Sequence, residues 1–248
     1  MKLLFSILSM ALAISFANAQ VLPADTIFSF QDAINNGKLK LGTDTLVSYI
    51  ESEAIRDKIS DNVRTIEFNN NQYKITTYNK AAGSEDITKV EAILDGKDLH
   101  ILRFYLKSKN DSAFAQYKNA MIKGWLQIPQ QEKKNISYAF EGNTFLSDGN
   151  TPWLIGLLEL KENQTIVIPV FHLFSNSLRW KTYEVLGEEA ITINDISFSC
   201  WKVDAGPLGP PGFNAFHWYT KNTGKLLRVV LSKEGETAMY VSELKNIQ

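Results

Sequence analysis

The residues best suited to acid–base or metal chemistry are the three histidines, and their spacing argues against a shared site. His100, His172 and His217 each lie between apolar neighbours in a segment that alternates like a β-strand. Because side chains alternate across a strand, each histidine should point to the polar face, away from its neighbours. A three-histidine metal site would require three distant strands to converge. The sequence therefore predicts no metal site.

Other patterns of catalytic residues are missing from the sequence. It contains no G-x-S-x-G, no H-E-x-x-H and no glycine-rich phosphate loop. The adjacent Glu188 and Glu189 fall on opposite faces of a strand, so they cannot act together on one substrate. We expect no catalytic residue and no cofactor, and the protein is predicted not to be an enzyme. A hydrolase that uses one of the histidines stays open as an alternative.

Large aromatic side chains are the remaining candidates for a binding site. Such side chains suit the walls of a concave apolar pocket, because they bury a large area and Trp also carries a polar N–H group. The competing interpretation is that they only fill the core. The candidates for an apolar groove are Trp125, Trp153, Phe171, Trp180, Trp201 and Trp218, with Phe174 close by in the sequence.

The first nineteen residues have the three parts of a cleavable secretory signal peptide. Lys2 precedes a nearly unbroken apolar run that ends at Phe16, and Ala17-Asn18-Ala19 is an A-x-A cleavage pattern. The run is shorter than the roughly 20 apolar residues of a membrane-spanning helix. We therefore predict cleavage between Ala19 and Gln20 and a periplasmic or secreted protein. Since no cysteine follows the cleavage site, a lipoprotein is not expected.

Cysteine content and charge narrow the function classes further. Cys200 is the only cysteine, so an intrachain disulfide is impossible, and we interpret it as a small buried apolar residue. The net charge is −1, with acidic and basic residues mixed along the chain. Nucleic-acid binding needs a basic patch, which the sequence lacks. No segment after the signal peptide is apolar enough to span a membrane. The expected partner is an apolar or lipid-like ligand or an envelope protein.

Period-two alternation begins at Arg64 and recurs along most of the chain, which predicts about ten to twelve strands. Residues 69–71 and Asp95-Gly96 are predicted hairpin turns. Apolar residues from Gly42 to Ser60 are spaced as in a helix, with a strand from Thr43 as the alternative. Residues 112–128 fit a strand pair or a short helix. Thr151-Pro152 predicts a short helix up to Leu158, and the Gly/Pro-rich residues 206–212 predict an exposed turn.

These elements predict a mainly β protein. Short turns between consecutive strands favour one large curved antiparallel sheet, or a partial β-barrel, with one or two short helices. We expect a single domain over residues 20–248. Two similar β halves, residues 20–145 and 146–248, are the alternative division.

Residues 150–235 resemble a family of bacterial exported proteins of unknown function. The matching features are a Leu-rich segment, an Ile-Pro strand, a Val-x-Gly-x-Glu strand, a Trp-containing strand and a final aromatic hairpin. Here they are Leu157 to Leu160, Ile168-Pro169, Val185 to Glu189, Cys200 to Val203, Trp218-Tyr219 and Leu226 to Val230. The resemblance implies a curved antiparallel half-barrel similar to periplasmic lipoprotein carriers, whose concave face holds apolar chains. It implies no catalytic residues.

Three functions follow from these observations. The first is a non-catalytic binding or carrier module for an apolar or lipid-like ligand. The second is an envelope structural or protein-interaction module that uses residues 206–212. The third is the histidine-dependent hydrolase. An open concave face would favour the first function, whereas a face filled by side chains would favour the second.

Overall fold

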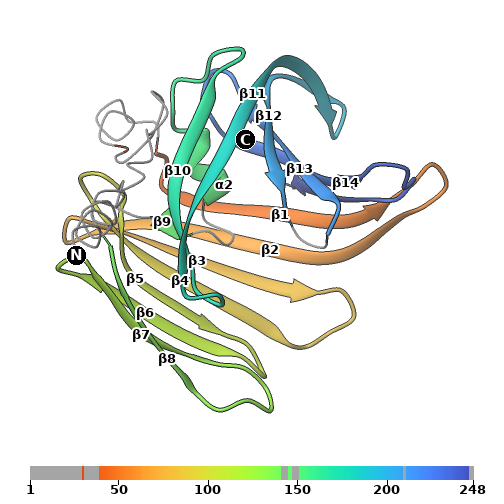
Figure 1. Ribbon diagram of the computed structural model, residues 1–248. Helices are drawn as coiled ribbons and strands as arrows, with labels where there is room; N and C mark the ends of the chain where they lie inside the picture. Colours follow the sequence, from red (N-terminus) through yellow and green to blue (C-terminus); the bar gives the residue numbers. More distant parts are fainter. Residues whose placement is uncertain (1–29, 31–38, 141–144, 147–150, 209–210, 246–248) are drawn as a thin grey trace, which may run out of the picture.

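The fold is one long antiparallel sheet that curls on itself, seen in a computed structural model (Figure 1). The structure describes Phe30, residues 39–140, 145–146, 151–208 and 211–245. The predicted signal peptide and its cleavage site at Ala19 and Gln20 lie outside these residues. Within them, no helix is both long enough and apolar enough to cross a membrane.

The N-terminal arm is a meander of eight consecutive strands, each paired with the next. Its strands are β1 (Gly42–Glu51), β2 (Arg56–Asn69), β3 (Gln72–Ala81), β4 (Ile87–Asp95), β5 (Ile101–Lys107), β6 (Ser112–Lys118), β7 (Met121–Gln127) and β8 (Lys134–Ala139).

The C-terminal arm contains a short helix and the remaining strands. Its elements are β9 (Phe145–Leu146), α2 (Thr151–Ile155), β10 (Thr165–His172), β11 (Ser177–Ile193), β12 (Ile196–Pro207), β13 (Phe213–Thr220), β14 (Leu226–Lys233) and β15 (Met239–Leu244). The arms join where β1 pairs antiparallel with β15, and β9 adds parallel to β10 at the far edge. The predicted fold class, a large antiparallel sheet with very little helix, is confirmed.

The helix predicted from Gly42 to Ser60 is wrong. This segment forms β1, a turn and the start of β2, and the turn is closed by a hydrogen bond from the Ser52 N–H to the Ile55 carbonyl oxygen. Ala54 and Ile55, which completed the helical spacing, are exposed in that turn. A bulge at Ser48/Tyr49 further disturbs the period of two. Of the two interpretations of residues 112–128, the strand pair β6–β7 is the correct one.

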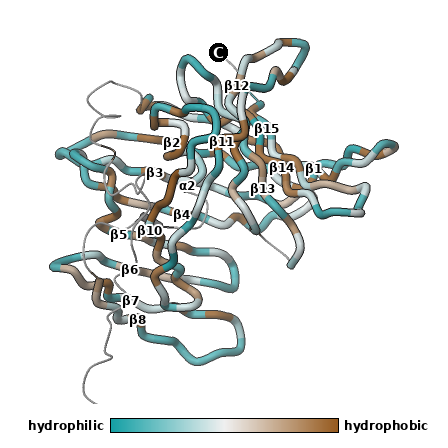
Figure 2. Tube along the Cα trace, turned by 45° about the horizontal axis from the view of Figure 1, so that its top comes forward, coloured by the Kyte–Doolittle hydropathy of each residue, from teal (hydrophilic) through white to brown (hydrophobic). Residues whose placement is uncertain are grey.

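The face of the sheet that carries the larger core is called the inner face. Across β2–β8 the register aligns one inner row, namely Ile66, Ile75, Ala92, Phe104, Ala115, Gly124 and Ile136. The small residues in this row leave room for a second layer. The curl of the sheet supplies it, because Phe171 of β10 packs against Tyr117 of β6 and Tyr138 of β8, with ring centroids 6.4 and 5.4 Å apart. Figure 2 shows β10 as a strongly hydrophobic strand inside the curl.

A second, smaller core lies on the outer face of β12, β13 and β14. Trp218 belongs to it, whereas the next residue, Tyr219, belongs to the inner core. β11 also contributes to the outer core, because a bulge at Gly187 (φ 137°) exchanges the two faces of this strand. The buried members are Ile191, Ile193, Cys200, Trp218, Leu227, Val230, Val241 and Leu244. The C-terminal arm is therefore buried on both faces of its central strands.

Candidate functional site

A cavity lined by described residues opens at the inner seam between the two arms. It has a volume of about 520 Å³, within the usual range for small-molecule pockets. We call it the seam pocket. Its walls are residues 39–44, Arg64 and Ile66 of β2, Trp153 of α2 and residues 223–226 at the β13–β14 turn.

The seam pocket exists because α2 lies across the inner face of the C-terminal arm. The Tyr219 hydroxyl donates a hydrogen bond to the Pro152 carbonyl oxygen over 2.5 Å. The backbone following α2 also touches the β13–β14 turn, since a Cβ on Gly156 would lie 1.9 Å from the Gly224 carbonyl oxygen. Only glycine at both positions allows this approach, and Gly224 in addition has φ +65°. These contacts fix Trp153 over the pocket.

One wall of the seam pocket is charged. The Asp44 carboxylate accepts a hydrogen bond from Arg64 Nη2 at 2.9 Å, and Lys225 Nζ lies 3.1 Å from its other oxygen. Burial alone would raise the pKa of Asp44, but the two cations outweigh it and hold the pKa below its usual value. With Lys40 also in the lining, three cations face one carboxylate. The wall therefore carries a net positive charge.

Two buried donors on side chains that line the seam pocket have no hydrogen-bond partner in the described part of the chain. They are Arg64 Nε and Trp153 Nε1. Arg64 is 9% exposed and Trp153 is 5% exposed, and the guanidinium lies 5.7 Å from the centroid of the indole ring. Buried donors are nearly always satisfied in folded proteins. The lining also contains the apolar residues Leu41, Ile66 and Leu226, which form the apolar wall of the pocket.

The six aromatic residues proposed for a groove do not share one surface. Trp153 lines the seam pocket, and Trp201 lines a small cavity of about 90 Å³ beside it. Phe171 is fully buried in the inner core, and Trp218 belongs to the outer core.

The other two lie elsewhere. Trp125 is on the outer face of β7, where Lys133 Nζ lies 4.1 Å from its ring centroid. Trp180 is half-buried on β11, opposite Pro169.

His217 corrects the expectation that each histidine lies on a polar face. It is fully buried on the inner face of β13, because both faces of this strand are covered. Its Nδ1 lies 3.0 Å from the Tyr219 hydroxyl, which itself donates to Pro152, so Nδ1 carries the proton toward Tyr219. Burial lowers the pKa of His217 to about 3, with a smaller contribution from Lys181. His217 is thus a neutral part of the network that holds α2.

The remaining histidines are half-buried at strand ends. His100 Nδ1 lies 2.5 Å from Asp98 Oδ1, and His172 Nδ1 lies 2.8 Å from Ser175 Oγ. His100, Asp98 and Asp95 bring one ligand atom each within 4.8 Å of one another. The carboxylates also accept hydrogen bonds from backbone N–H groups of the same turn, Asp95 from Lys97 and Asp98 from His100. This cluster builds the β4–β5 turn.

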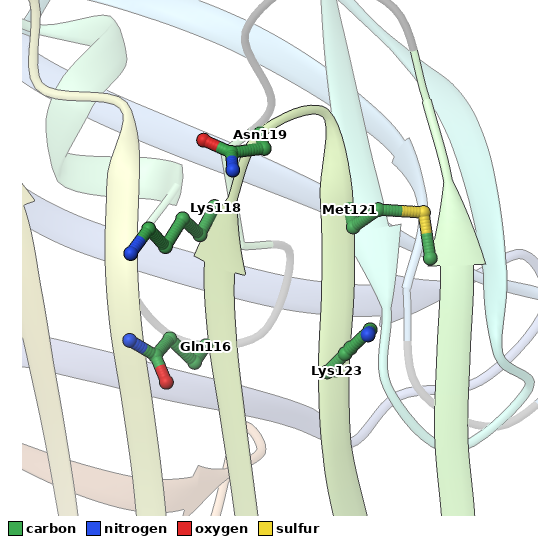
Figure 3. Close-up of a pocket in the computed structure, with 5 residues that line it drawn as sticks. All are labelled: Gln116, Lys118, Asn119, Met121 and Lys123. Atoms are coloured by element: carbon green, nitrogen blue, oxygen red, sulfur yellow. The ribbon is translucent and has the colours of Figure 1, made fainter.

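A shallower depression of about 250 Å³ lies at the tip of the β6–β7 hairpin (Figure 3). Its lining consists of Gln116, Lys118, Asn119, Met121 and Lys123, of which all but Met121 are exposed. It has no extended apolar wall. The seam pocket is the better candidate, because it combines buried donors, a charged wall and an apolar wall. The sequence reasoning missed Arg64 and Asp44, which lie on different strands and meet only through the β1–β2 register.

Comparison with known proteins gives a family for this chain. A family model described as "Protein of unknown function (DUF3108)" matches residues 47–242. The chain belongs to this family. The match to DUF3108 includes Arg64, Trp153, Gly156 and Lys225 of the seam pocket and its support. An uncharacterised family, as the sequence resemblance implied, is thereby confirmed.

The chain was also compared with individual curated proteins and with solved structures. No curated protein matches the sequence. Among solved structures, the chain is similar to a beta-barrel-like protein of the domain of unknown function DUF1849 from Brucella abortus. The sequence identity is 10% and the TM-score 0.47, and the match covers 84% of this chain and 98% of that one.

Cys200 is confirmed as a buried apolar residue. It is fully buried in the outer core, where burial raises the pKa of its thiol to about 11. A thiol that stays protonated is a poor nucleophile, so its contribution is packing.

Proposed function

We propose that this protein is an exported, non-catalytic binding module that holds an apolar or lipid-like ligand in the seam pocket. The observation that carries the proposal is a cavity of about 520 Å³ with an apolar wall, beside the close backbone contact of Gly156 with Gly224 that holds α2 against the β13–β14 turn. Export rests on residues 1–19, which have the composition of a signal peptide. The absence of a catalytic motif in the sequence supports a binding role.

The pocket lies where the two arms join. Among the described residues, part of the remaining inner face is filled by side chains, since Phe171 is fully buried against β6 and β8. A ligand of the seam pocket is therefore of modest size, as its volume of about 520 Å³ also requires.

Binding of an uncharged apolar fluorophore, N-phenyl-1-naphthylamine, tests the proposal. We expect saturable binding, with an affinity that falls severalfold in Leu41→Glu, because this variant places a carboxylate at the apolar wall. Leu41 is 58% exposed, so the fold should tolerate the change. The matched control is Ile55→Glu in the β1–β2 turn, where the side chain is 53% exposed and outside the pocket. Absence of saturable binding, or equal loss in both variants, would contradict the proposal.

The filled part of the inner face favours a second function, an envelope module that acts through protein contacts. Residues 206–212 were predicted as its contact segment, and 209–210 lie outside the described residues. Leu208 packs against the inner core and its N–H donates to the Phe213 carbonyl oxygen, which ties the start of this loop to the fold. Deletion of residues 209–211 should abolish capture of a partner protein without changing the melting temperature. Unchanged capture would reject the loop as the contact.

A further inference from the structure

We infer that the ligand of the seam pocket carries an anionic head group, a carboxylate or a phosphate, at the end of an apolar body. This inference rests on the proposed function and names the chemical class of its ligand. Three groups from three elements converge on one wall, namely Arg64 of β2, Trp153 of α2 and Lys225 of the β13–β14 turn.

The first argument is the charge balance of this wall. Asp44 is the one carboxylate among the described residues of the lining, and it already bonds both Arg64 and Lys225. Arg64 is nine-tenths buried and paired with Asp44, so the surplus positive charge of the lining lies on the partly exposed Lys225 and on the exposed Lys40. An anion that enters the pocket would be attracted by this surplus charge.

The second argument is the direction of hydrogen bonding. Arg64 Nε and Trp153 Nε1 can only donate, and neither has a partner within the residues that the structure describes. An uncharged apolar ligand would leave both donors unsatisfied. A carboxylate or phosphate offers several acceptor oxygens and forms short, strong hydrogen bonds with an arginine.

The third argument concerns the shape of the pocket. Leu41, Ile66 and Leu226 provide an apolar wall in the same cavity as the charged groups. An inorganic anion would use only the charged wall, and a hydrocarbon only the apolar wall. A compound with one anionic end and one apolar end uses both, so the two walls together select an amphiphile.

Calorimetric titration of the whole mature protein with compounds that share a ten-carbon chain tests the inference. The probes are decanoate, decyl phosphate and 1-decanol, with acetate and inorganic phosphate as head groups without a chain. Decanoate or decyl phosphate should bind about tenfold more tightly than decanol, since a hydrogen bond to a charged group exceeds a neutral one by roughly this factor. Which of the two binds more tightly identifies the head group. Acetate and phosphate should bind far more weakly than either.

Three conservative variants separate head-group recognition from folding. Arg64→Lys keeps the charge beside Asp44 but removes the Nε donor, and Trp153→Phe removes the indole N–H while keeping a smaller aromatic ring. Lys225→Met removes a cation whose side chain is 32% exposed, and Lys221→Met, 31% exposed and outside the pocket, is its matched control. Each of the first three should reduce the preference for the anion over decanol about three- to tenfold. Lys221→Met should not change it.

The outcomes distinguish the inference from the proposed function. Equal binding of decanoate, decyl phosphate and decanol would overturn the anionic head group while leaving an apolar binding module. An anion preference that survives in Arg64→Lys, Trp153→Phe and Lys225→Met would overturn it as well, because the preference would arise elsewhere. Binding of none of the three chains would overturn both.

Discussion

The two arms of the sheet differ in how many faces of their strands are buried. The N-terminal arm buries one face, and in β6 buried residues alternate strictly with more exposed ones. In the C-terminal arm β10 has an unbroken buried run from Ile166 to Phe171, and β13 buries His217, Trp218 and Tyr219 in succession. Strands that are covered on both faces have continuous apolar runs in their sequence. The C-terminal arm is therefore the packing centre, around which the N-terminal arm curls.

Removal of the Phe171 side chain should have the largest effect on this arrangement. Phe171 is the contact from β10 to both β6 and β8, so Phe171→Ala should lower the free energy of unfolding by about 3–5 kcal/mol. Phe114→Ala is the control, since Phe114 is half-buried on the outer face of β6 and should cost about 1 kcal/mol. Urea denaturation measures both. Equal losses would show that the two faces of β6 contribute alike to stability, contrary to the one-sided burial described above.

A methyl group on Gly156 should have the next largest effect. Its Cβ would meet the Gly224 carbonyl oxygen at 1.9 Å and Tyr219 Cδ1 at 2.7 Å, so Gly156→Ala should cost about 3 kcal/mol and loosen α2. Gly83→Ala in the N-terminal arm meets no atom within 4 Å and has φ +72°, so only backbone strain of about 1 kcal/mol is expected. Thermal unfolding compares them. A smaller loss for Gly156→Ala than for Gly83→Ala would mean that the close approach is not needed.

Acid should destabilise the protein through the C-terminal arm. Burial lowers the pKa of His217 to about 3, against an ordinary value of 6.5 in the unfolded chain. Between these values the unfolded chain binds the extra proton, so stability is present above pH 6.5 and falls as the pH drops toward 3. The expected slope is about 1.4 kcal/mol per pH unit. His217→Gln should flatten it, as measured by urea denaturation at pH 7, 6 and 5.

His172→Gln is the control variant, because it removes an imidazole from the half-buried end of β10 and leaves the buried His217 in place. We expect it to retain the slope of the unmodified protein. A slope that is unchanged in His217→Gln would show that the acid sensitivity comes from other groups.

The exposed ion pairs of the N-terminal arm should have the smallest effect. Lys74 Nζ lies 3.5 Å from Glu91 and 4.0 Å from Glu67 on the outer face. Because solvent and salt screen such pairs, Lys74→Met should change the free energy of unfolding by less than about 1 kcal/mol. High salt should remove the difference. A larger, salt-sensitive loss would mean that this face is more important for stability than its exposure suggests.

Sequence patterns predicted the elements well where one face is buried and poorly where a turn interrupts the period. The hairpin turn at residues 69–71 is confirmed, with Asn70 and Asn71 at φ 50° and 57°, a conformation that asparagine tolerates. The short helix is also present, although it ends at Ile155. The helix over Gly42–Ser60 was wrong, because the exposed turn residues Ala54 and Ile55 continued an apolar spacing that the bulge had already shifted.

The candidate site could be predicted only in part. Trp153 was among the aromatic candidates, but Trp218 and Trp201 come from adjacent strands and lie on opposite faces of the sheet. A sequence shows that an aromatic residue is buried, but not which of two cores it joins when both faces of its strand are covered. The charged wall left no local signal, because Asp44, Arg64 and Lys225 are far apart in the sequence.

The strand-rich character of the chain and most of its turns could be predicted from the amino-acid sequence alone, since they depend on periodicity and on residues close in the chain. The pairing of β1 with β15, the position of β10 inside the curl and the shared cavity of Arg64 and Trp153 became visible only in the folded protein. These contacts depend on strand register and on sheet curvature. Both are set by bulges and by the packing of small against large residues across many strands, which no local pattern records.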